Sequence, residues 1–258
     1  MGVKLFKHAK IGDAPRTPAQ PYYNSPALEE ARKTLLVEAF SLGYPISFAQ
    51  EQGGALIQNI IPVHKTEYEQ ISTSSKVQLA LHTETAFHPH KPDHVMLLCL
   101  RGDPAAVTTY ANVEDIVSQL SNEMLQYLQD PAYTTSVDKS FKLPGKKYRQ
   151  TTLQLLKKIG SEYNMTYDED LMKPTNILAS MAIDKFAEAV SKCVQEIVLE
   201  TGDLLVIDNN KTIHGRKPFQ PKYDGTDRWV QRMLVRKNLP PPSEIKGHII
   251  ITDFEIKL

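Results

Sequence analysis

The stretch LHTETAFHPH, residues 81–90, decides the fold of this chain together with GDLLVIDNNKTIHG, residues 202–215. The first stretch places His82 and Glu84 two residues apart, and the second supplies His214. Side chains two apart on a strand point to the same face, so the imidazole of His82 and the carboxylate of Glu84 can reach one ion. Two imidazoles and one carboxylate on one face of a metal form the ligand set of non-haem Fe(II) oxygenases. We therefore predict that strands distant in the sequence bring these three residues together.

The H-x-E tripeptide has low specificity by itself. The chain contains eight histidines, and a hydrogen-bonded histidine at the surface end of a strand fits the same pattern. A zinc hydrolase also uses two histidines and a glutamate, although the helical H-E-x-x-H spacing is absent from this sequence. A metal-dependent binding jelly roll without turnover is a third hypothesis. His88 and His90 lie in a proline-flanked loop, which indicates local structure rather than metal ligation.

Two arginines follow His214 on the next predicted strand. Arg228 and Arg232 are four residues apart and therefore share one face of that strand. Like charges in one pocket destabilise it unless anions neutralise them, and a guanidinium binds a carboxylate through two parallel hydrogen bonds. A dicarboxylate co-substrate and a carboxylate substrate would supply these anions. The alternative is a pair of solvated arginines on an exposed strand, with Trp229 and Met233 on its buried face.

The bulk composition argues against several classes of protein. The 258 residues include 30 Lys and Arg against 30 Asp and Glu, and a net charge of zero argues against nucleic-acid and membrane-surface binding. We expect no transmembrane helix, because no apolar run reaches about 18 residues. The N-terminal stretch lacks the apolar core of a secretory signal. Two cysteines do not make a disulfide framework, so we expect a cytoplasmic protein.

Hydrophobic periodicity and turn residues divide the chain into expected strands and helices. Residues 1–25 are polar and proline-containing and predict an extended arm. Helices are expected at residues 26–43, 112–128 and 179–200, with Gly43 and Gly202 as stop signals. Strands are expected at residues 54–63, 77–82, 94–100, 105–111, 204–207, 228–236 and, at a sheet edge, 249–256. Residues 146–167 are ambiguous. Strands around the candidate ligands with helices outside them suggest a sandwich or barrel with helical insertions.

Longer stretches resemble the clavaminate synthase-like (TauD-type) branch of the Fe(II)/2-oxoglutarate dioxygenases. They are HTETAFHPHKPDHVMLLCLRGDP, TTYA and GDLLVIDNNKTIHGRKPFQPKYDGTDRWVQRMLVR, and the likeness extends over about residues 54–237. The resemblance implies a mainly β fold with helical insertions, a double-stranded β-helix (jelly roll) core flanked by α-helices. It also implies that His82, Glu84 and His214 hold Fe(II), with 2-oxoglutarate and O2 as co-substrates.

The same resemblance assigns roles to further residues. Arg228 would bind the distal carboxylate of 2-oxoglutarate, with help from Thr109. Glu84 replaces the aspartate that is usual in the family, as in the subgroup that acts on free amino acids, and the chain is most similar to the arginine hydroxylases there. By that pattern Arg232 would hold the substrate α-carboxylate, while Gln58 and the second oxygen of Glu84 would hold the α-amino group.

A segment of about residues 140–175 would form a lid over the active site. Within it, Asp168 and Asp170 would pair with a guanidinium or an ammonium group, although an ordinary solvated acidic loop is the alternative. We therefore expect one domain, residues 1–258, that acts as a monomer or homodimer and hydroxylates Cβ or Cγ of a free amino acid, L-arginine or another basic one. Lysine or asparagine as the substrate, or desaturation in natural-product biosynthesis, are the alternatives.

Overall fold

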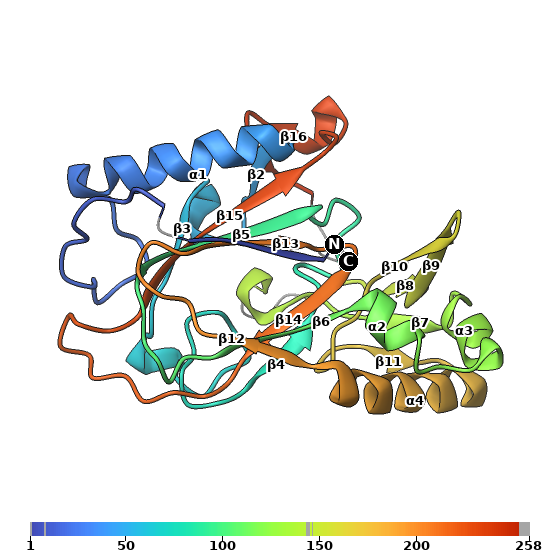
Figure 1. The fold of residues 1–258 in the computed structure, drawn as a ribbon. Helices are drawn as coiled ribbons and strands as arrows, with labels where there is room; N and C mark the ends of the chain where they lie inside the picture. The colour runs from blue at the N-terminus through green and yellow to red at the C-terminus, as the bar shows by residue number, and fades with distance from the viewer. Residues whose placement is uncertain (1, 8, 143–144, 146, 253–258) are drawn as a thin grey trace.

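Two β-sheets face each other in the structure, a computed structural model that describes residues 2–7, 9–142, 145 and 147–252. Helices lie on the outer sides of the two sheets (Figure 1). The larger sheet has the order β1 (Val3–Phe6), β13 (Leu204–Asp208), β5 (His94–Arg101), β15 (Trp229–Arg236), β2 (Tyr44–Phe48), β17 (Ile249–Ile250), β16 (Ile245–Lys246), with β3 (Gln58–Ile60) also paired to β15. The smaller sheet has the order β12 (Gln195–Ile197), β6 (Thr108–Asn112), β14 (Thr212–Arg216), β4 (Leu79–His82). This arrangement confirms the predicted mainly β jelly-roll core with flanking helices.

The remaining elements surround this core. The chain between β6 and β12 forms a three-stranded sheet and a hairpin. The sheet has the order β11 (Lys173–Pro174), β7 (Tyr133–Thr135), β8 (Thr151–Leu153), and the hairpin pairs β9 (Leu156–Ile159) with β10 (Glu162–Met165). The α-helices are α1 (Glu29–Leu42), α2 (Val113–Val117), α3 (Asn122–Leu128) and α4 (Ile177–Cys193). Short 3-10 turns are η1 (Pro26–Leu28), η2 (Gln52–Gly54), η3 (His64–Thr66), η4 (Lys139–Phe141) and η5 (Pro242–Glu244).

Strand β5 explains how the larger sheet is covered on both sides. Its Met96 and Leu98 pack against α1 in one apolar cluster, whereas Val95 and Leu97 belong to the cluster on the other face. Burial on both faces accounts for the unbroken apolar run of this strand. Helix α1 ends at Gly43, which has φ +153° and where a Cβ atom would collide with the carbonyl oxygen of Arg236. The predicted glycine stop is therefore confirmed.

Several element boundaries differ from the sequence predictions. The expected N-terminal arm contains β1, which adds to the edge of the larger sheet beside β13. Strand β2 was not predicted, and the expected strand at residues 54–63, which starts at Gly54 in a positive-φ conformation of 78°, is reduced to β3. The last strand is not at an edge, since β17 lies between β2 and β16. Residues 253–256 of that prediction fall outside the described residues.

Two predicted helices are also shorter than expected. The helix at residues 112–128 is divided into α2 and α3, and Ser121 caps the second by accepting a hydrogen bond from Met124 N. Helix α4 begins after the Asn176 cap and ends at Cys193, well before Gly202. The residues beyond it form β12, which pairs with β6. Pairing with an open sheet edge outweighs the local helical pattern there.

Candidate active site

Strand pairing brings the three predicted metal ligands together. His82 ends β4 and lies directly opposite His214 of β14, with ring centroids 4.6 Å apart. Glu84 follows β4, and its Oε2 lies 3.7 Å from His214 Nε2. One donor atom from each of the three residues lies within 4.8 Å of the others. Two strands and one turn therefore converge on a space that one metal ion can fill.

Asn209, in the turn between β13 and β14, fixes the backbone of Glu84. Glu84 N donates to Asn209 Oδ1 at 2.7 Å, and Asn209 Nδ2 donates to the carbonyl oxygen of Glu84 at 3.1 Å. The chain turns sharply after Glu84, because Thr85 has a φ of 50°. The carboxylate is thereby held beside the strand of His214 although Glu84 itself is outside a strand.

Both imidazoles have lone pairs available for a metal. His82 Nδ1 lies 2.8 Å from the carbonyl oxygen of Ala80, to which it donates, so Nε2 carries the lone pair. Burial, and then the neighbouring His82, lower the pKa of His214 to about 3, so this ring is neutral. His214 Nδ1 is buried and has no hydrogen-bond partner within the described residues. A neutral, desolvated pair of rings beside a carboxylate fits a divalent cation of the Fe(II) type.

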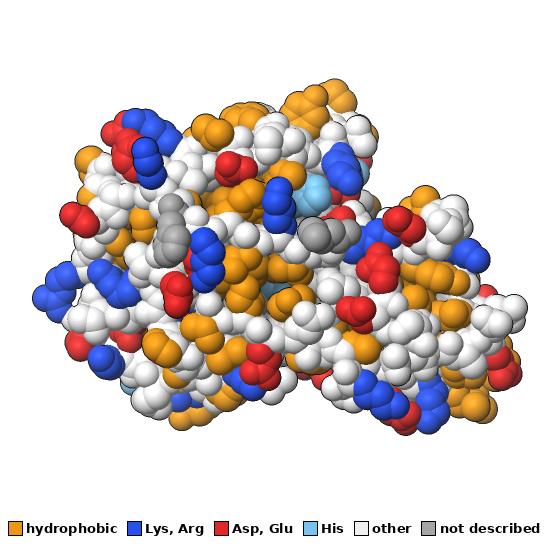
Figure 2. Space-filling view, viewed as in Figure 1, with side chains coloured by type: hydrophobic (Ala, Val, Ile, Leu, Met, Phe, Trp, Pro, Cys, Tyr) orange, Lys and Arg blue, Asp and Glu red, His pale blue; other side chains and the backbone are white. Residues whose placement is uncertain are grey.

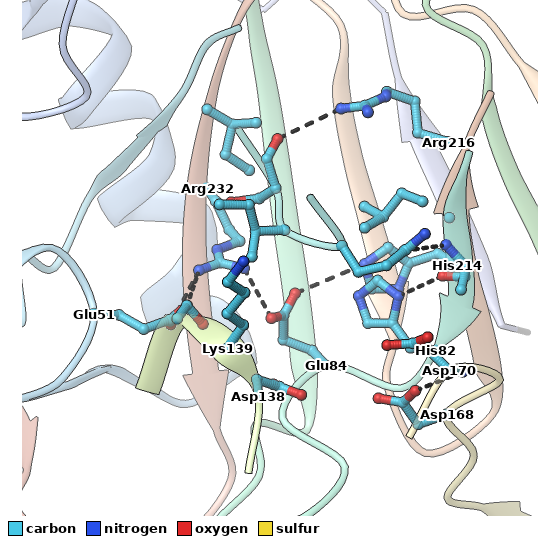
Figure 3. A pocket seen from close by; sticks show the side chains of 18 of the residues that line it. Glu51, His82, Glu84, Asp138, Lys139, Asp168, Asp170, His214, Arg216 and Arg232 are labelled. Carbon is cyan, nitrogen blue, oxygen red and sulfur yellow. Dashed lines mark hydrogen bonds and ion pairs between the residues drawn. The ribbon is translucent and has the colours of Figure 1, made fainter. Parts of the chain in front are cut away.

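Glu84 also contacts Arg232, the second of the two predicted arginines (Figure 3). Arg232 Nη1 donates to Glu84 Oε1 at 2.8 Å, and Nη2 reaches both oxygens of Glu51 at 3.0 Å. Burial would raise the pKa of Glu84, but the charge of Arg232 and the two imidazoles outweigh it and lower the pKa. Glu84 is thus ionised, with one oxygen toward the histidines and one toward Arg232.

Gln58 supports Arg232 from behind and does not line the cavity. Its Oε1 accepts a hydrogen bond from Arg232 Nε at 2.9 Å.

The cavity beside the histidines has a volume of about 490 Å³ and is lined by residues from both sheets, including Leu97 and Val230 of the larger one. Charged side chains of both signs are interspersed over the face shown in Figure 2, around apolar side chains near its centre.

The predicted acidic pair also borders this cavity. Asp168 and Asp170 both line it, and Asp168 forms an isolated backbone bridge with His82. Asp168 Oδ1 accepts hydrogen bonds from the backbone nitrogens of Asp170 and Leu171, so one oxygen orders its own turn. A further acid that the sequence did not indicate, Asp138, lines the same space. Burial, and then the charge of Asp168, raise the pKa of Asp138 well above its usual range.

Arg228 and a second arginine, Arg216, line the cavity as well. Both are buried, at 7% and 4% exposed. In the described part of the chain the Arg228 guanidinium makes no hydrogen bond or ion pair. Such a group can hold an anion, as predicted for the co-substrate carboxylate.

The threonine expected beside Arg228 needs a correction. In the regular pairing of β6 with β14, Thr108 lies opposite Arg216 and Tyr110 opposite His214. Thr108 therefore shares the face of His214 and lines the cavity. Thr109 shares the opposite face with Ala111, which packs in the cluster around α4. The alternation of the strand makes Thr108, and not Thr109, the hydroxyl that can reach a ligand.

Comparison with known proteins agrees with this geometry. A model of the family described as taurine catabolism dioxygenase TauD, TfdA family, matches residues 29–234. An L-lysine 3-hydroxylase of Catenulispora acidiphila is 34% identical over 75% of this chain and 55% of its own length. An L-asparagine oxygenase of Streptomyces coelicolor is 35% identical over 88% of this chain and 69% of its own length. A non-haem iron oxygenase solved with Fe, succinate and (3S)-hydroxy-L-Arg has a TM-score of 0.89 at 27% identity, covering 97% of this chain and 82% of that one.

A jelly roll with two histidines and a carboxylate at one end of its cavity defines the class of non-haem iron oxygenases. The chain belongs to the TauD/TfdA family of dioxygenases. Members of this family use Fe(II), 2-oxoglutarate and O2. The chain spans little more than half the length of the lysine hydroxylase that it matches. No helix within the described residues is long and apolar enough to cross a membrane.

Sequence reasoning missed four residues of the site. For two of them a signal existed: Arg216 is two residues after His214 on one strand, and Thr108 is next to the predicted Thr109. For Glu51 and Asp138 there was none, because both lie outside the longer strands and reach the cavity only through loop packing. His88 and His90 are outside the ligand cluster. His90 Nε2 instead lies 2.9 Å from Glu244 Oε2.

Proposed function

We propose that this chain is an Fe(II)/2-oxoglutarate-dependent hydroxylase that oxidises Cβ or Cγ of a free basic amino acid, with L-arginine as the first candidate. The observation that carries the proposal is the combination in one cavity of Arg232 beside Glu84 with the acids Asp138, Asp168 and Asp170. The first pair suits the charged α-carbon end of an amino acid, and the acids suit a cationic side chain. The similar proteins support the substrate class, since they include an L-lysine 3-hydroxylase, an L-asparagine oxygenase and an oxygenase solved with (3S)-hydroxy-L-Arg.

The α-carboxylate and α-ammonium groups of the substrate would be bound by Arg232 and Glu84, whose opposite charges already pair in the structure. The substrate α-carboxylate would accept from Arg232, and the α-ammonium would donate to Glu84 Oε1, which Arg232 contacts at 2.8 Å in the structure. Gln58 and Glu51 hold the guanidinium in place. Because a bidentate guanidinium fixes the direction of a carboxylate, this contact also orients the substrate side chain.

The iron centre, with 2-oxoglutarate and O2, would supply the oxidising power for cleaving an unactivated C–H bond. His82, Glu84 and His214 would hold the metal on one side and leave the other side for co-substrate and oxygen. Arg228 and Thr108 would bind the distal carboxylate of 2-oxoglutarate. Leu97 and Val230 form apolar walls that exclude water from the reacting carbon.

The acidic residues favour a cation over a neutral side chain. Burial raises the pKa of Asp168, and the nearby His82, which lowers it, offsets only part of this effect. A guanidinium or ammonium placed between Asp138 and Asp168 would favour their ionised forms and give charge-assisted hydrogen bonds. We propose that the segment at residues 140–175 acts as the lid that carries part of this acidic group.

The test is succinate formation from 2-oxoglutarate with Fe(II), ascorbate and each of the twenty amino acids. We expect arginine, or another basic amino acid, to stimulate turnover most strongly and to yield a product heavier by one oxygen atom in mass spectrometry. His82→Ala should abolish turnover. A product lighter by two hydrogens would identify desaturation, and stimulation by asparagine alone would contradict the role given to the acids. The zinc-hydrolase and binding-only alternatives predict no succinate at all.

Substitution of the acids tests the substrate class more directly. Asp168→Asn and Asp170→Asn should lower kcat/KM for a basic amino acid about tenfold or more, as expected for loss of a charge-assisted contact. Asp184→Asn, on the exposed face of α4, is the matched control and should leave kcat/KM unchanged.

We also propose that the protein works in a reducing, cytoplasmic setting, which the free thiols of Cys99 and Cys193 support. It would be a monomer or a homodimer, and light scattering would distinguish the two.

A further inference from the structure

Two buried arginines, Arg216 and Arg228, line the cavity without an ion pair to a described carboxylate. Arg216 donates from Nη2 to Ser74 Oγ at 3.1 Å, from Nη1 to the carbonyl oxygen of Ser72 at 3.5 Å and from Nε to that of Lys217 at 3.3 Å. All three acceptors are neutral. Neither Arg216 nor Arg228 forms an ion pair with any residue that the structure describes. Neither buried charge is therefore matched by an ion-paired carboxylate among the described residues.

Arg216 belongs to the same face of β14 as the metal ligand His214. The two residues are two apart on one strand, and in Figure 3 both side chains extend from it toward the same side. Thr108 lies directly across from Arg216 in the neighbouring strand. Arg216, Arg228 and Thr108 line the same cavity as the three metal ligands. Two guanidinium groups and one hydroxyl thus border the space beside the metal site.

Burying two like charges together is costly unless an anion joins them. The anion must be small enough for this end of the cavity and must leave the metal accessible. A dicarboxylate with one end at the metal and the other at the arginines meets both conditions. We propose that Arg216 supplies a second positive charge to the site for the distal carboxylate of 2-oxoglutarate, acting beside Arg228 and Thr108. The inference rests on the proposed function in that 2-oxoglutarate is the co-substrate.

A purely structural role is the competing explanation for Arg216. Its guanidinium lies 5.0 Å from the ring of Phe219, and its bonds to Ser72 and Ser74 tie down the loop that precedes β4. If this were its whole role, substitution would weaken the fold and the metal site without distinguishing one 2-oxo acid from another. A co-substrate role predicts a loss that depends on the distal carboxylate.

The experiment measures binding without turnover. Protein loaded with Co(II) is titrated anaerobically with 2-oxoglutarate and, separately, with 2-oxobutyrate, which lacks the distal carboxylate. Arg216→Met should raise the Kd of 2-oxoglutarate about tenfold to a hundredfold, the range expected for one charge-assisted contact, and leave that of 2-oxobutyrate within about twofold. Arg216→Lys, which keeps the charge, should recover most of the affinity for 2-oxoglutarate.

Matched variants separate the contact from loss of structure. Ser74→Ala removes an anchor of Arg216 and should raise the Kd of 2-oxoglutarate less than Arg216→Met does. Arg236→Met removes another arginine, bound to backbone oxygens on the far end of β15, and should change neither Kd. The Kd of Co(II) alone should be the same in all variants, because the metal ligands are intact.

The outcomes distinguish this inference from the proposed function. If Arg216→Met weakens both 2-oxo acids and Co(II) equally, or changes nothing, Arg216 has only a structural role and the inference is overturned. If Arg216→Met does not fold, the same comparison between Arg216→Lys, Ser74→Ala and the wild type decides. If the wild type binds no 2-oxoglutarate, the proposed function fails and the inference fails with it. Binding of 2-oxoglutarate that depends on Arg216, without amino-acid-stimulated turnover, would sink the hydroxylase proposal alone.

Discussion

Arg232 stays charged although it is buried, because two carboxylates and an amide oxygen surround its guanidinium group. Burial would lower its pKa, but Glu51 and Glu84 outweigh burial and raise it, so the group stays charged at every accessible pH. In turn Arg232 keeps Glu84 ionised, which is the form that a metal requires. One arginine thereby prepares the metal ligand and presents a binding group to the cavity.

Removing Arg232 should be costly for stability. Arg232→Met leaves Glu51 and Glu84 buried next to each other without a cation, and we expect a loss of about 3–5 kcal/mol in the free energy of unfolding, measured with urea. Adding Glu51→Gln to that variant should recover part of the loss. The control Arg236→Met breaks contacts to neutral backbone oxygens of Lys91 and Asn238 and should cost less than about 2 kcal/mol. Equal losses in the two arginine variants would contradict this account of the charge cluster.

The ammonium group of Lys91 should make the stability of the folded protein depend on pH in the alkaline range. Its half-buried Nζ donates to Asn210 Oδ1 at 2.7 Å, and burial lowers its pKa from 10.5 to about 8. The unfolded chain therefore binds more protons than the folded chain between these values, so stability rises with pH over that window. We expect a gain on the order of 1–3 kcal/mol between pH 8 and 10.5 in the wild type relative to Lys91→Met. Parallel profiles of the two proteins would show that the side chain is not desolvated.

Strand β4 ends at the metal ligand His82, and residues at this end of the strand also anchor the proposed lid. Thr83 points away from the metal, and its Oγ1 donates to the carbonyl oxygen of Tyr167 at 2.8 Å and accepts from Tyr167 N at 2.7 Å. Two residues earlier on the strand, Leu81 N donates to Glu169 Oε2 at 2.9 Å. Asp168 lies between these two tethers. The H-T-E tripeptide thus supplies two ligands, and the threonine between them positions the turn that carries an acid of the cavity.

The Thr83→Val substitution tests this coupling at the level of the element. Valine keeps the shape but leaves Tyr167 N buried without an acceptor, so we expect a loss of about 1–3 kcal/mol in stability and a higher KM for the amino acid. The Kd of 2-oxoglutarate should not change. Thr135→Val is the matched control, because the Thr135 hydroxyl is also buried but has no partner among the described residues, and it should be close to neutral. If KM is unaffected in Thr83→Val, the contact between Thr83 and Tyr167 does not position the segment.

At the scale of the whole molecule, the active site is the place where the two sheets meet. The smaller sheet supplies the histidines, whereas Arg232 belongs to β15 of the larger sheet and Arg228 directly precedes that strand. Ligands that join both sheets must therefore stabilise the folded state as a whole, since the unfolded chain cannot bind them in this geometry.

Binding of the metal, and then of 2-oxoglutarate, should each raise the melting temperature. At about 100 times its Kd, Fe(II) or Mn(II) adds about 2.7 kcal/mol, which for a chain of this size is a Tm increase of roughly 5–10 °C. 2-Oxoglutarate should add a further increase only when metal is present, and EDTA should reverse both. His82→Ala should show neither increase in differential scanning calorimetry. A response to 2-oxoglutarate without metal would place its binding site away from the metal ligands.

Much of this protein was determined by the sequence through local rules. The H-x-E spacing predicted that His82 and Glu84 lie together, although Glu84 follows β4 and is held by Asn209 rather than by strand alternation. A long apolar run predicted that β5 is covered on both sides, which depends only on solvation. The stop of α1 at Gly43 is also local in part, because its φ of +153° favours glycine, whereas the close approach of Arg236 is a tertiary contact.

Only the tertiary structure decided the parts that depend on long-range pairing. The register of β6 against β14 selected Thr108 over Thr109 for the cavity, and a shift by one residue would have reversed that choice. Helix α4 stopped at Cys193 because the following residues found a sheet edge to pair with. Glu51 became the partner of Arg232 through the packing of a loop without its own pattern. Side-chain direction is local to a strand, whereas the neighbour across the sheet is set by the whole fold.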